Sequence, residues 1–132
     1  MVSPTDILGA ISDDRSLLLF NAIALSNSES SDILATRLNL TRKQYYSRMS
    51  ELVRTNLVNR RNGKYFLTSL GKIVYDAQTT IRKAIADYWK LKAIDELELE
   101  DRGEMPKEEY NKIINSLIHN EKIKEGLKIQ AT

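Results

Sequence analysis

The side chains with the clearest chemical capacity in this chain are nine lysines and arginines that lie close together in the sequence. The stretch from Thr36 to Lys72 contains these nine cations and a single acid, Glu51, so its net charge is +8. The whole chain of 132 residues carries only +2, so the remaining residues sum to −6. A compact basic surface binds polyanions, because neutralising phosphates releases condensed counterions. The pattern therefore predicts a surface that binds a phosphate backbone.

The residue types do not indicate metal binding, catalysis or a nucleotide-binding loop. The chain has no cysteine and a single histidine, His119, which leaves no thiolate metal site and no catalytic triad. Its five glycines are isolated, so no glycine-rich phosphate loop is present. The acidic stretch Asp95–Glu109 does not have the spacing of a calcium loop. We expect a protein that is not an enzyme and that uses no cofactor or metal.

The composition is that of a water-soluble globular protein, with 42% hydrophobic and 29% charged residues. The longest apolar stretch, Leu17–Leu25, contains Asn21 and is too short to span a bilayer. The first ten residues contain no basic residue and do not resemble a secretory signal. We expect a cytoplasmic protein without a membrane partner.

The basic stretch must be positioned by elements whose starts are visible in the sequence. Ser3 followed by Pro4 predicts a short helix over Pro4–Ala10, and a second helix should begin after Ser12. A turn is expected over 27–30, followed by a third helix over Ser31–Asn39. In that third helix we expect Ile33, Leu34 and Leu38 to point inward.

The next helix, 41–55, has the strongest start signal. Thr41 and Gln44 fit a capping box, in which each side chain pairs with the other residue's backbone N–H. A buried stripe is expected from Tyr45, Met49 and Leu52, because they are spaced i, i+4 and i+7. The opposite face presents Lys43, Ser47, Ser50 and Arg54, flanked by Tyr46. Asn56 suits the left-handed residue that ends a helix.

A β-hairpin is expected directly after this helix. Asn62-Gly63 separates Leu57–Arg61 from Lys64–Thr68, and Asn-Gly between two strand-like runs is a strong hairpin signal because both residues tolerate positive φ. The hairpin brings Arg60, Arg61, Asn62 and Lys64 to its tip and flanks.

The C-terminal half is predicted to be helical. A long helix from Leu70 to Leu97, capped by Thr68 or Ser69, carries an apolar heptad stripe. An acidic segment with Gly103 follows, and Pro106 starts a last helix that Gly126 ends. That last helix has an apolar face formed by Tyr110, Ile113, Ile114, Leu117 and Ile118.

Taken together, the stretch from Ser12 to Tyr88 resembles the winged helix-turn-helix domains of small archaeal and bacterial transcriptional regulators. The resemblance rests on Ile33–Thr41 across the helix and turn, on the spacing Tyr45, Met49, Leu52, Leu57, Val58, and on Tyr65–Lys72. The last run is similar to the Y-x-L-T-x-x-G ending that follows the wing in many such regulators. Asn56 departs from the glycine usual in the family. The resemblance implies a helix (41–55) in the DNA major groove and a wing (57–68) on the adjacent backbone.

Three sets of residues are the candidate sites, each with a simpler explanation. On the 41–55 helix, contacts to duplex DNA are assigned to Arg42, Lys43, Gln44, Tyr46, Ser47, Ser50 and Arg54; the alternative is a solvated helix face. Arg48 lies nearer the buried stripe and is expected to flank the DNA-binding face or to be structural. On the wing, Arg60, Arg61, Asn62 and Lys64 should hold phosphates, although cations also protect exposed strands from edge pairing.

The third set is a homodimer seam on the long helix. Its members are Val74, Ala77, Ile81, Ala84, Ile85, Tyr88, Trp89 and Leu91. The alternative is that these side chains pack within the monomer. A dimer would place two recognition helices about 34 Å apart on a palindromic site.

The sequence thus predicts a mainly α fold with a small β-hairpin, a winged helix-turn-helix with added C-terminal helices. Residues 1–68 would form the DNA-binding core, and 69–132 a long helix, an acidic linker and a C-terminal helix that dimerise. The predicted function is a sequence-specific regulator of transcription that binds double-stranded DNA as a homodimer. A winged-helix module for protein–protein interaction is the main alternative, and structured RNA shares the charge signature. No small-molecule effector is identified.

Overall fold

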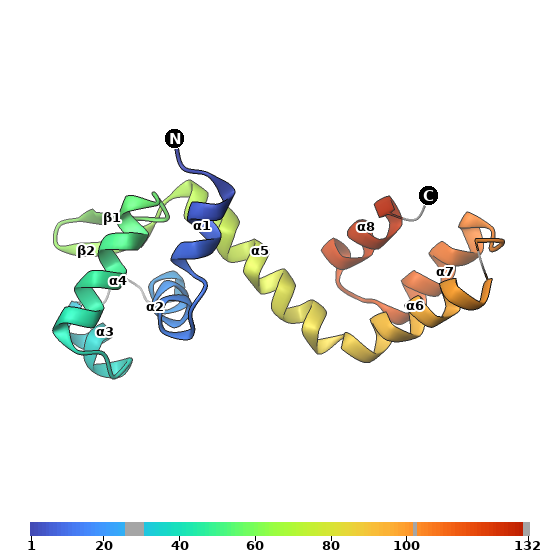
Figure 1. The fold of residues 1–132 in the computed structure, drawn as a ribbon, viewed down its shortest axis with the longest axis horizontal. Coiled ribbons are helices and arrows are strands. Elements are labelled where there is room, and N and C mark those ends of the chain that lie inside the picture. Colours follow the sequence, from blue (N-terminus) through green and yellow to red (C-terminus); the bar gives the residue numbers. More distant parts are fainter. Residues whose placement is uncertain (26–30, 102, 131–132) are drawn as a thin grey trace. The chain divides into compact units, whose positions relative to one another are not determined.

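The computed structural model describes residues 1–25, 31–101 and 103–130, which form two compact units whose boundary lies within the helix α5 (Ser69–Ala86) (Figure 1). Unit 1 is Met1–Asp76 and unit 2 is Ala77–Thr132. The predicted class is confirmed, since the described residues form helices and one two-stranded antiparallel hairpin. The predicted turn over 27–30 lies outside the described residues. No helix in the described part is long and apolar enough to cross a membrane.

Unit 1 begins with two helices whose starts are fixed by side-chain caps. The predicted helix over Pro4–Ala10 is confirmed as α1: Asp6 N–H donates to Ser3 Oγ at 3.1 Å, and Ser3 N–H donates to Asp6 Oδ2 at 3.0 Å. The next helix, α2 (Asp14–Leu25), follows Asp13, whose Oδ1 accepts the Ser16 N–H at 2.9 Å. Both caps satisfy backbone N–H groups that a helix start leaves unpaired.

The third and fourth helices follow, and the fourth matches its prediction closely. α3 (Ser31–Arg37) is shorter than the predicted Ser31–Asn39, because Asn39 adopts a left-handed φ of 55°. α4 (Arg42–Arg54) begins with the predicted capping box: Gln44 N–H donates to Thr41 Oγ1 at 3.1 Å, and Thr41 N–H donates to Gln44 Oε1 at 3.0 Å. Asn56, with φ 63°, ends the segment as predicted.

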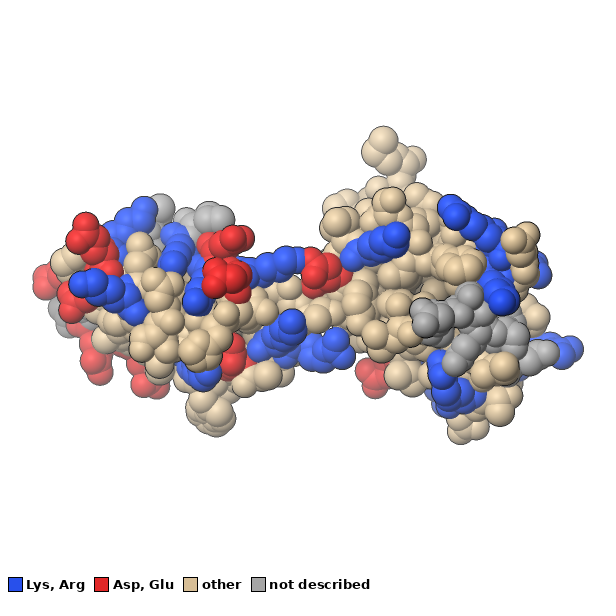
Figure 2. All heavy atoms as spheres, turned by 180° about the vertical axis from the view of Figure 1, so that it is seen from behind, with Lys and Arg blue, Asp and Glu red and all other residues tan. Residues whose placement is uncertain are grey.

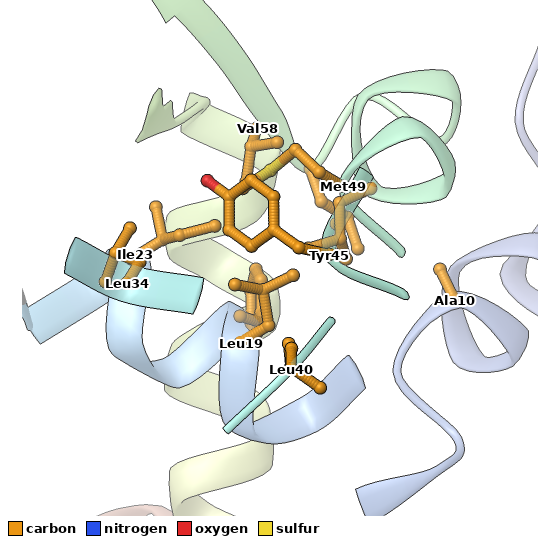
Figure 3. Close-up of a cluster of buried hydrophobic side chains, with 11 residues drawn as sticks. Ala10, Leu19, Ile23, Leu34, Leu40, Tyr45, Met49 and Val58 are labelled. Carbon is orange, nitrogen blue, oxygen red and sulfur yellow. The ribbon is translucent and has the colours of Figure 1, made fainter. Parts of the chain in front are cut away.

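The core of unit 1 is built around α4. Tyr45, Met49 and Leu52 are each at most 1% exposed, which confirms the predicted stripe. Figure 3 shows the Tyr45 ring among side chains from α2, α3 and β1, including Leu34. The prediction that Ile33 points inward is wrong, because its side chain is 55% exposed. A helix of two turns can bury only one line of side chains in the core. Leu34 and Ala35 lie on that side of α3, and Leu38, directly after the helix, packs on the same core.

The hairpin follows α4 directly and lies beside it (Figure 1). β1 (Val58–Arg61) and β2 (Lys64–Leu67) pair with Arg61 opposite Lys64 and Arg60 opposite Tyr65. Asn62 and Gly63 have φ values of 52° and 77°, which confirms the predicted Asn-Gly turn.

The prediction of one helix from Leu70 to Leu97 is wrong. α5 (Ser69–Ala86) ends before Asp87, and α6 (Tyr88–Asp101) begins after it. Aspartate competes with the helix backbone for hydrogen bonds and favours helix starts over helix interiors. The Asp87 carbonyl accepts the Leu91 N–H at 3.0 Å, so this residue precedes the first turn of α6.

The prediction of one C-terminal helix ending at Gly126 is also wrong. α7 (Lys107–Leu117) and α8 (Glu121–Gln130) are separated by an extended Ile118, and Gly126 lies inside α8. Asn120 Oδ1 accepts the Ile123 N–H at 3.1 Å and so starts α8. The core of unit 2 consists of Ile94, Tyr110, Ile114, Ile118 and Ile123.

Candidate nucleic acid interface

The exposed side of α4 is one continuous arc of the helix surface. At 100° per residue, seven exposed side chains fall within 140° of one another, opposite the buried stripe. They are Arg42, Lys43, Tyr46, Ser47, Ser50, Val53 and Arg54. All the residues predicted on this helix except Gln44 therefore share one face, and Val53 joins them as a member that the sequence prediction omitted.

The N-terminal end of this arc is unusually basic. Arg42 and Lys43 occupy the first two positions of α4, and its first turn has no acid. Cations here oppose the positive end of the helix dipole, at a cost of about 0.3–1 kcal/mol each. In the described part of the chain, neither side chain is paired with a carboxylate. Arg42 and Lys43 thus destabilise the helix and remain exposed. Such a pair of cations is suited to binding an external anion.

Other polar side chains of α4 are already engaged. Arg54 donates from Nε to Glu51 Oε2 at 3.0 Å and also pairs through Nη2 with Oε1. This contact lowers the pKa of Glu51 and raises that of Arg54, so the pair is charged but locally neutral. Gln44 uses its side-chain oxygen in the cap. Arg48 donates to Ser16 Oγ at 2.8 Å and pairs with Asp13, as expected of a structural residue.

The pairing register divides the hairpin cations between its two faces. Arg60 and Tyr65 are cross-strand partners, with the Arg60 guanidinium carbon 6.0 Å from the ring centroid. Tyr65 lines a groove against α4, so this face adjoins the exposed arc. Arg61 and Lys64 share the opposite face, where Arg61 lines a separate hollow. The sequence prediction grouped these cations without distinguishing their faces.

The separate hollow is lined in part by polar residues that the predicted site does not include. Lys72 and Asn59 line it together with Arg61 and Phe66. At the tip, Arg61 and Lys64 are like charges directly opposite each other, which is unfavourable by several tenths of a kcal/mol. Asn62, also exposed, occupies the turn beside them. Strand alternation, with Asn59, Arg61 and Phe66 at related positions, could have identified this face.

Charge is distributed differently over the surfaces of the two units. Figure 2 shows Lys and Arg side chains prevailing on the visible face of unit 1, at the right of that view, while acidic and basic side chains mix on unit 2. The excess of positive charge between Thr36 and Lys72 thus belongs to unit 1.

The predicted dimer residues fall into two classes. Val74 packs against the core of unit 1, and Ala84 and Leu91 pack against that of unit 2. The others stay exposed: Ala77, Ile81 (58%), Ile85 (69%), Tyr88 (50%) and Trp89 (79%). The Tyr88 and Trp89 rings meet edge to face at 5.1 Å.

Comparison with known proteins gives one structural likeness. No protein-family model and no curated protein sequence matches the chain. The activation domain of the phage T4 transcription factor MotA aligns with 62% of this chain and 92% of its own length, at 17% sequence identity and a TM-score of 0.49. A likeness at this level leaves function to be argued from the residues themselves.

Proposed function

We propose that unit 1 is a winged helix-turn-helix domain that binds double-stranded DNA and regulates transcription as a homodimer. α4 would enter the major groove with its exposed arc, and the hairpin would lie on the neighbouring backbone. Arg42 and Lys43 would contact phosphates or guanine edges, and Ser47 and Ser50 would reach bases. The protein would block or guide polymerase by occupying a promoter.

The basic start of α4 is the observation that carries this proposal. Exposed cations at a helix N-terminus weaken the fold, so their placement calls for an external anion. Arg60, on the hairpin face beside α4, adds a third positive side chain next to the same arc. A flexible polyanion could bind to any basic patch. A DNA groove also presents base edges, and α4 carries exposed hydroxyl groups between flanking cations that match both features.

The proposal is tested by charge reversal on α4. Arg42→Glu with Lys43→Glu should weaken binding to a fluorescent duplex at least tenfold, because two phosphate contacts become repulsive. Lys107→Glu with Lys112→Glu, two charge reversals at exposed lysines of α7, is the matched control and should bind like the unaltered protein. Unchanged binding by the folded double variant would refute the assignment.

The homodimer is proposed from the exposed stripe of unit 2. Ile81 and Ile85 lie one turn apart near the end of α5, and Tyr88 and Trp89 begin α6. All four are large exposed apolar side chains, which in water favours burial against a second copy. Ile85→Lys should convert a sedimenting dimer to a monomer, whereas Leu18→Lys, at an apolar residue of unit 1 that is also exposed, should not. A monomer at micromolar concentration for the unaltered chain would exclude this mode of dimerisation.

One observation favours a second candidate, an interaction module in a protein assembly. Tyr46 and Val53 are 49% and 44% exposed within the α4 arc, and a partner protein could bury them. Under that reading the double charge reversal leaves function intact, whereas Tyr46→Ala abolishes it. The absence of retention on any duplex in the random-pool selection described below would favour this candidate.

A further inference from the structure

A shallow groove, lined by no charged residue, lies between α4 and β2. Its lining residues are Tyr46, Ser47, Met49, Ser50, Val53 and Tyr65. Cations flank this groove: Arg42 and Lys43 at the start of α4, and Arg60 above Tyr65. The lining itself offers apolar surface and hydroxyl groups.

The walls of the groove are held in place by buried neighbours. The Tyr46 ring packs edge to face on the buried Tyr45 ring, with centroids 5.4 Å apart at 83°. Met49, only 1% exposed, belongs to the core and also lines the groove. Tyr65 is covered by the Arg60 guanidinium group. Tyr46, Met49 and Tyr65 are therefore each held by a neighbour, which lowers the cost of ordering them when a ligand binds.

The spacing along α4 matches the rise of a DNA duplex. Tyr46, Ser50 and Val53 follow one another at i, i+4 and i+7 and form a row about 10 Å long. A row of that length spans about three base-pair steps. Tyr46 and Val53, at the two ends of the row, are the exposed apolar members, and Ser50 lies between them.

We infer that this groove reads the 5-methyl groups of thymine. The inference rests on the proposed binding of duplex DNA and specifies which bases that binding selects. Thymine is the only standard base that presents a methyl group in the major groove, and apolar side chains read it by contact. Tyr46 and Val53 supply that contact, while Ser47 and Ser50 hydrogen-bond to the neighbouring base edges.

Charge decides between DNA and an apolar protein segment as the occupant. A protein ligand that buried Tyr46 and Val53 would have to place acidic groups beside three separate cations. A DNA duplex already has phosphates on both sides of its major groove, so it needs no added acidic groups to complement these cations. The one carboxylate of α4, Glu51, is paired with Arg54 and does not oppose a phosphate.

The test removes only the methyl group. Duplexes retained by the full-length protein from a random pool are sequenced, and the consensus is resynthesised with deoxyuridine in place of thymidine at one position at a time. Loss of a buried methyl group should weaken binding about fourfold at each contacted position. The measured quantity is the ratio of the affinity for the thymidine duplex to that for the deoxyuridine duplex. Val53→Thr, which keeps the shape of the side chain, should lower this ratio at one position, and Tyr46→Ala should lower it at another. Ile73→Thr, at an exposed residue of α5 outside the groove, should leave both ratios unchanged.

The outcomes separate the inference from the function on which it rests. A fourfold loss that Val53→Thr or Tyr46→Ala reduces supports the inference. Equal affinity for the thymidine and deoxyuridine duplexes overturns it and leaves DNA binding intact. A loss that persists in both variants also overturns it, since the methyl group then acts through DNA shape. If no duplex is retained at all, the proposed function fails together with the inference.

Discussion

Replacing Gly71 by alanine tests how the hairpin is held against α5. Gly71 lies in the first turn of α5 and is buried. Its N–H donates to Thr68 Oγ1 at 2.9 Å, and Thr68 Oγ1 in turn donates to the Asn56 carbonyl oxygen at 2.6 Å. Thr68 N–H donates to the Leu57 carbonyl oxygen at 3.1 Å. The entry and exit of the hairpin are thus tied to the start of α5.

The size of the effect follows from the space around Gly71. A Cβ atom there would lie 2.0 Å from the Leu57 carbonyl oxygen, and relief requires opening this contact to at least 3.0 Å. The clashing atom is backbone and accepts the Thr68 hydrogen bond, so it cannot move alone. Overpacking costs about 1–3 kcal/mol and a lost hydrogen bond about 1 kcal/mol. The gain in helix propensity is about 1 kcal/mol. The net loss should be about 1–3 kcal/mol in the free energy of unfolding of unit 1.

Urea unfolding followed by far-UV circular dichroism measures this loss. Gly9→Ala is the matched control, because Gly9 lies in α1 of the same unit with no atom within 4 Å of its added Cβ. Gly9→Ala should leave stability unchanged or raise it by up to about 1 kcal/mol. If Gly71→Ala is as stable as Gly9→Ala, the described packing of the hairpin on α5 is wrong.

Three further predictions concern other parts of the chain. Arg42→Glu should stabilise unit 1 by about 0.3–1 kcal/mol while weakening duplex binding, because it complements the α4 dipole and repels phosphate; urea unfolding and anisotropy measure the two effects. Arg48→Met should destabilise unit 1 by about 1–2 kcal/mol in urea, since it removes the bonds to Asp13 and Ser16. Burial raises the pKa of Tyr110 to about 12 from 10.0, so the folded state favours the neutral phenol. Its stabilising effect should hold below pH 10 and fade between about pH 10 and 12, and Tyr110→Phe should abolish this fading and the late phenolate absorbance.

The parts of the fold that sequence predicts are those governed by short-range rules. The Thr41 and Gln44 box, the Asn62-Gly63 turn and the left-handed Asn56 each depend on residues within a few positions of one another. Their conformations follow from backbone sterics and unpaired helix N–H groups, which distant contacts seldom override.

The breaks within the C-terminal helices were missed because tertiary packing decides them. The heptad stripe continues past Asp87 in the sequence, yet α5 ends before this residue, and both Ala84 in α5 and Leu91 in α6 pack on the core of unit 2. Ile118 is fully buried in an extended conformation. The apolar pattern predicts a helix there, because a buried extended residue and a buried helical residue are both apolar. Periodicity reports which side chains are apolar, and it does not show where the chain turns.

For the candidate site, the sequence predicts which residues are exposed on α4, but it does not predict which side chains they pair with. The exposed arc of α4 follows from helix geometry alone, so Lys43, Ser47 and Ser50 could be placed in advance. The pairing of Arg54 with Glu51 depends on rotamer choice, and the separation of Arg60 from Arg61 depends on strand register. The spacing of charged residues in the sequence determines neither this ion pair nor this separation.

Binding of duplex DNA by the exposed arc of α4 and the hairpin tip can be followed residue by residue, from the backbone amide NMR shifts of the 132-residue chain as a selected duplex is added. We expect the largest shifts at Lys43, Tyr46 and Ser50 and at 60–64, with little change over α7 and α8. Shifts confined to unit 2, or no shifts while unit 1 remains folded, would contradict this expectation.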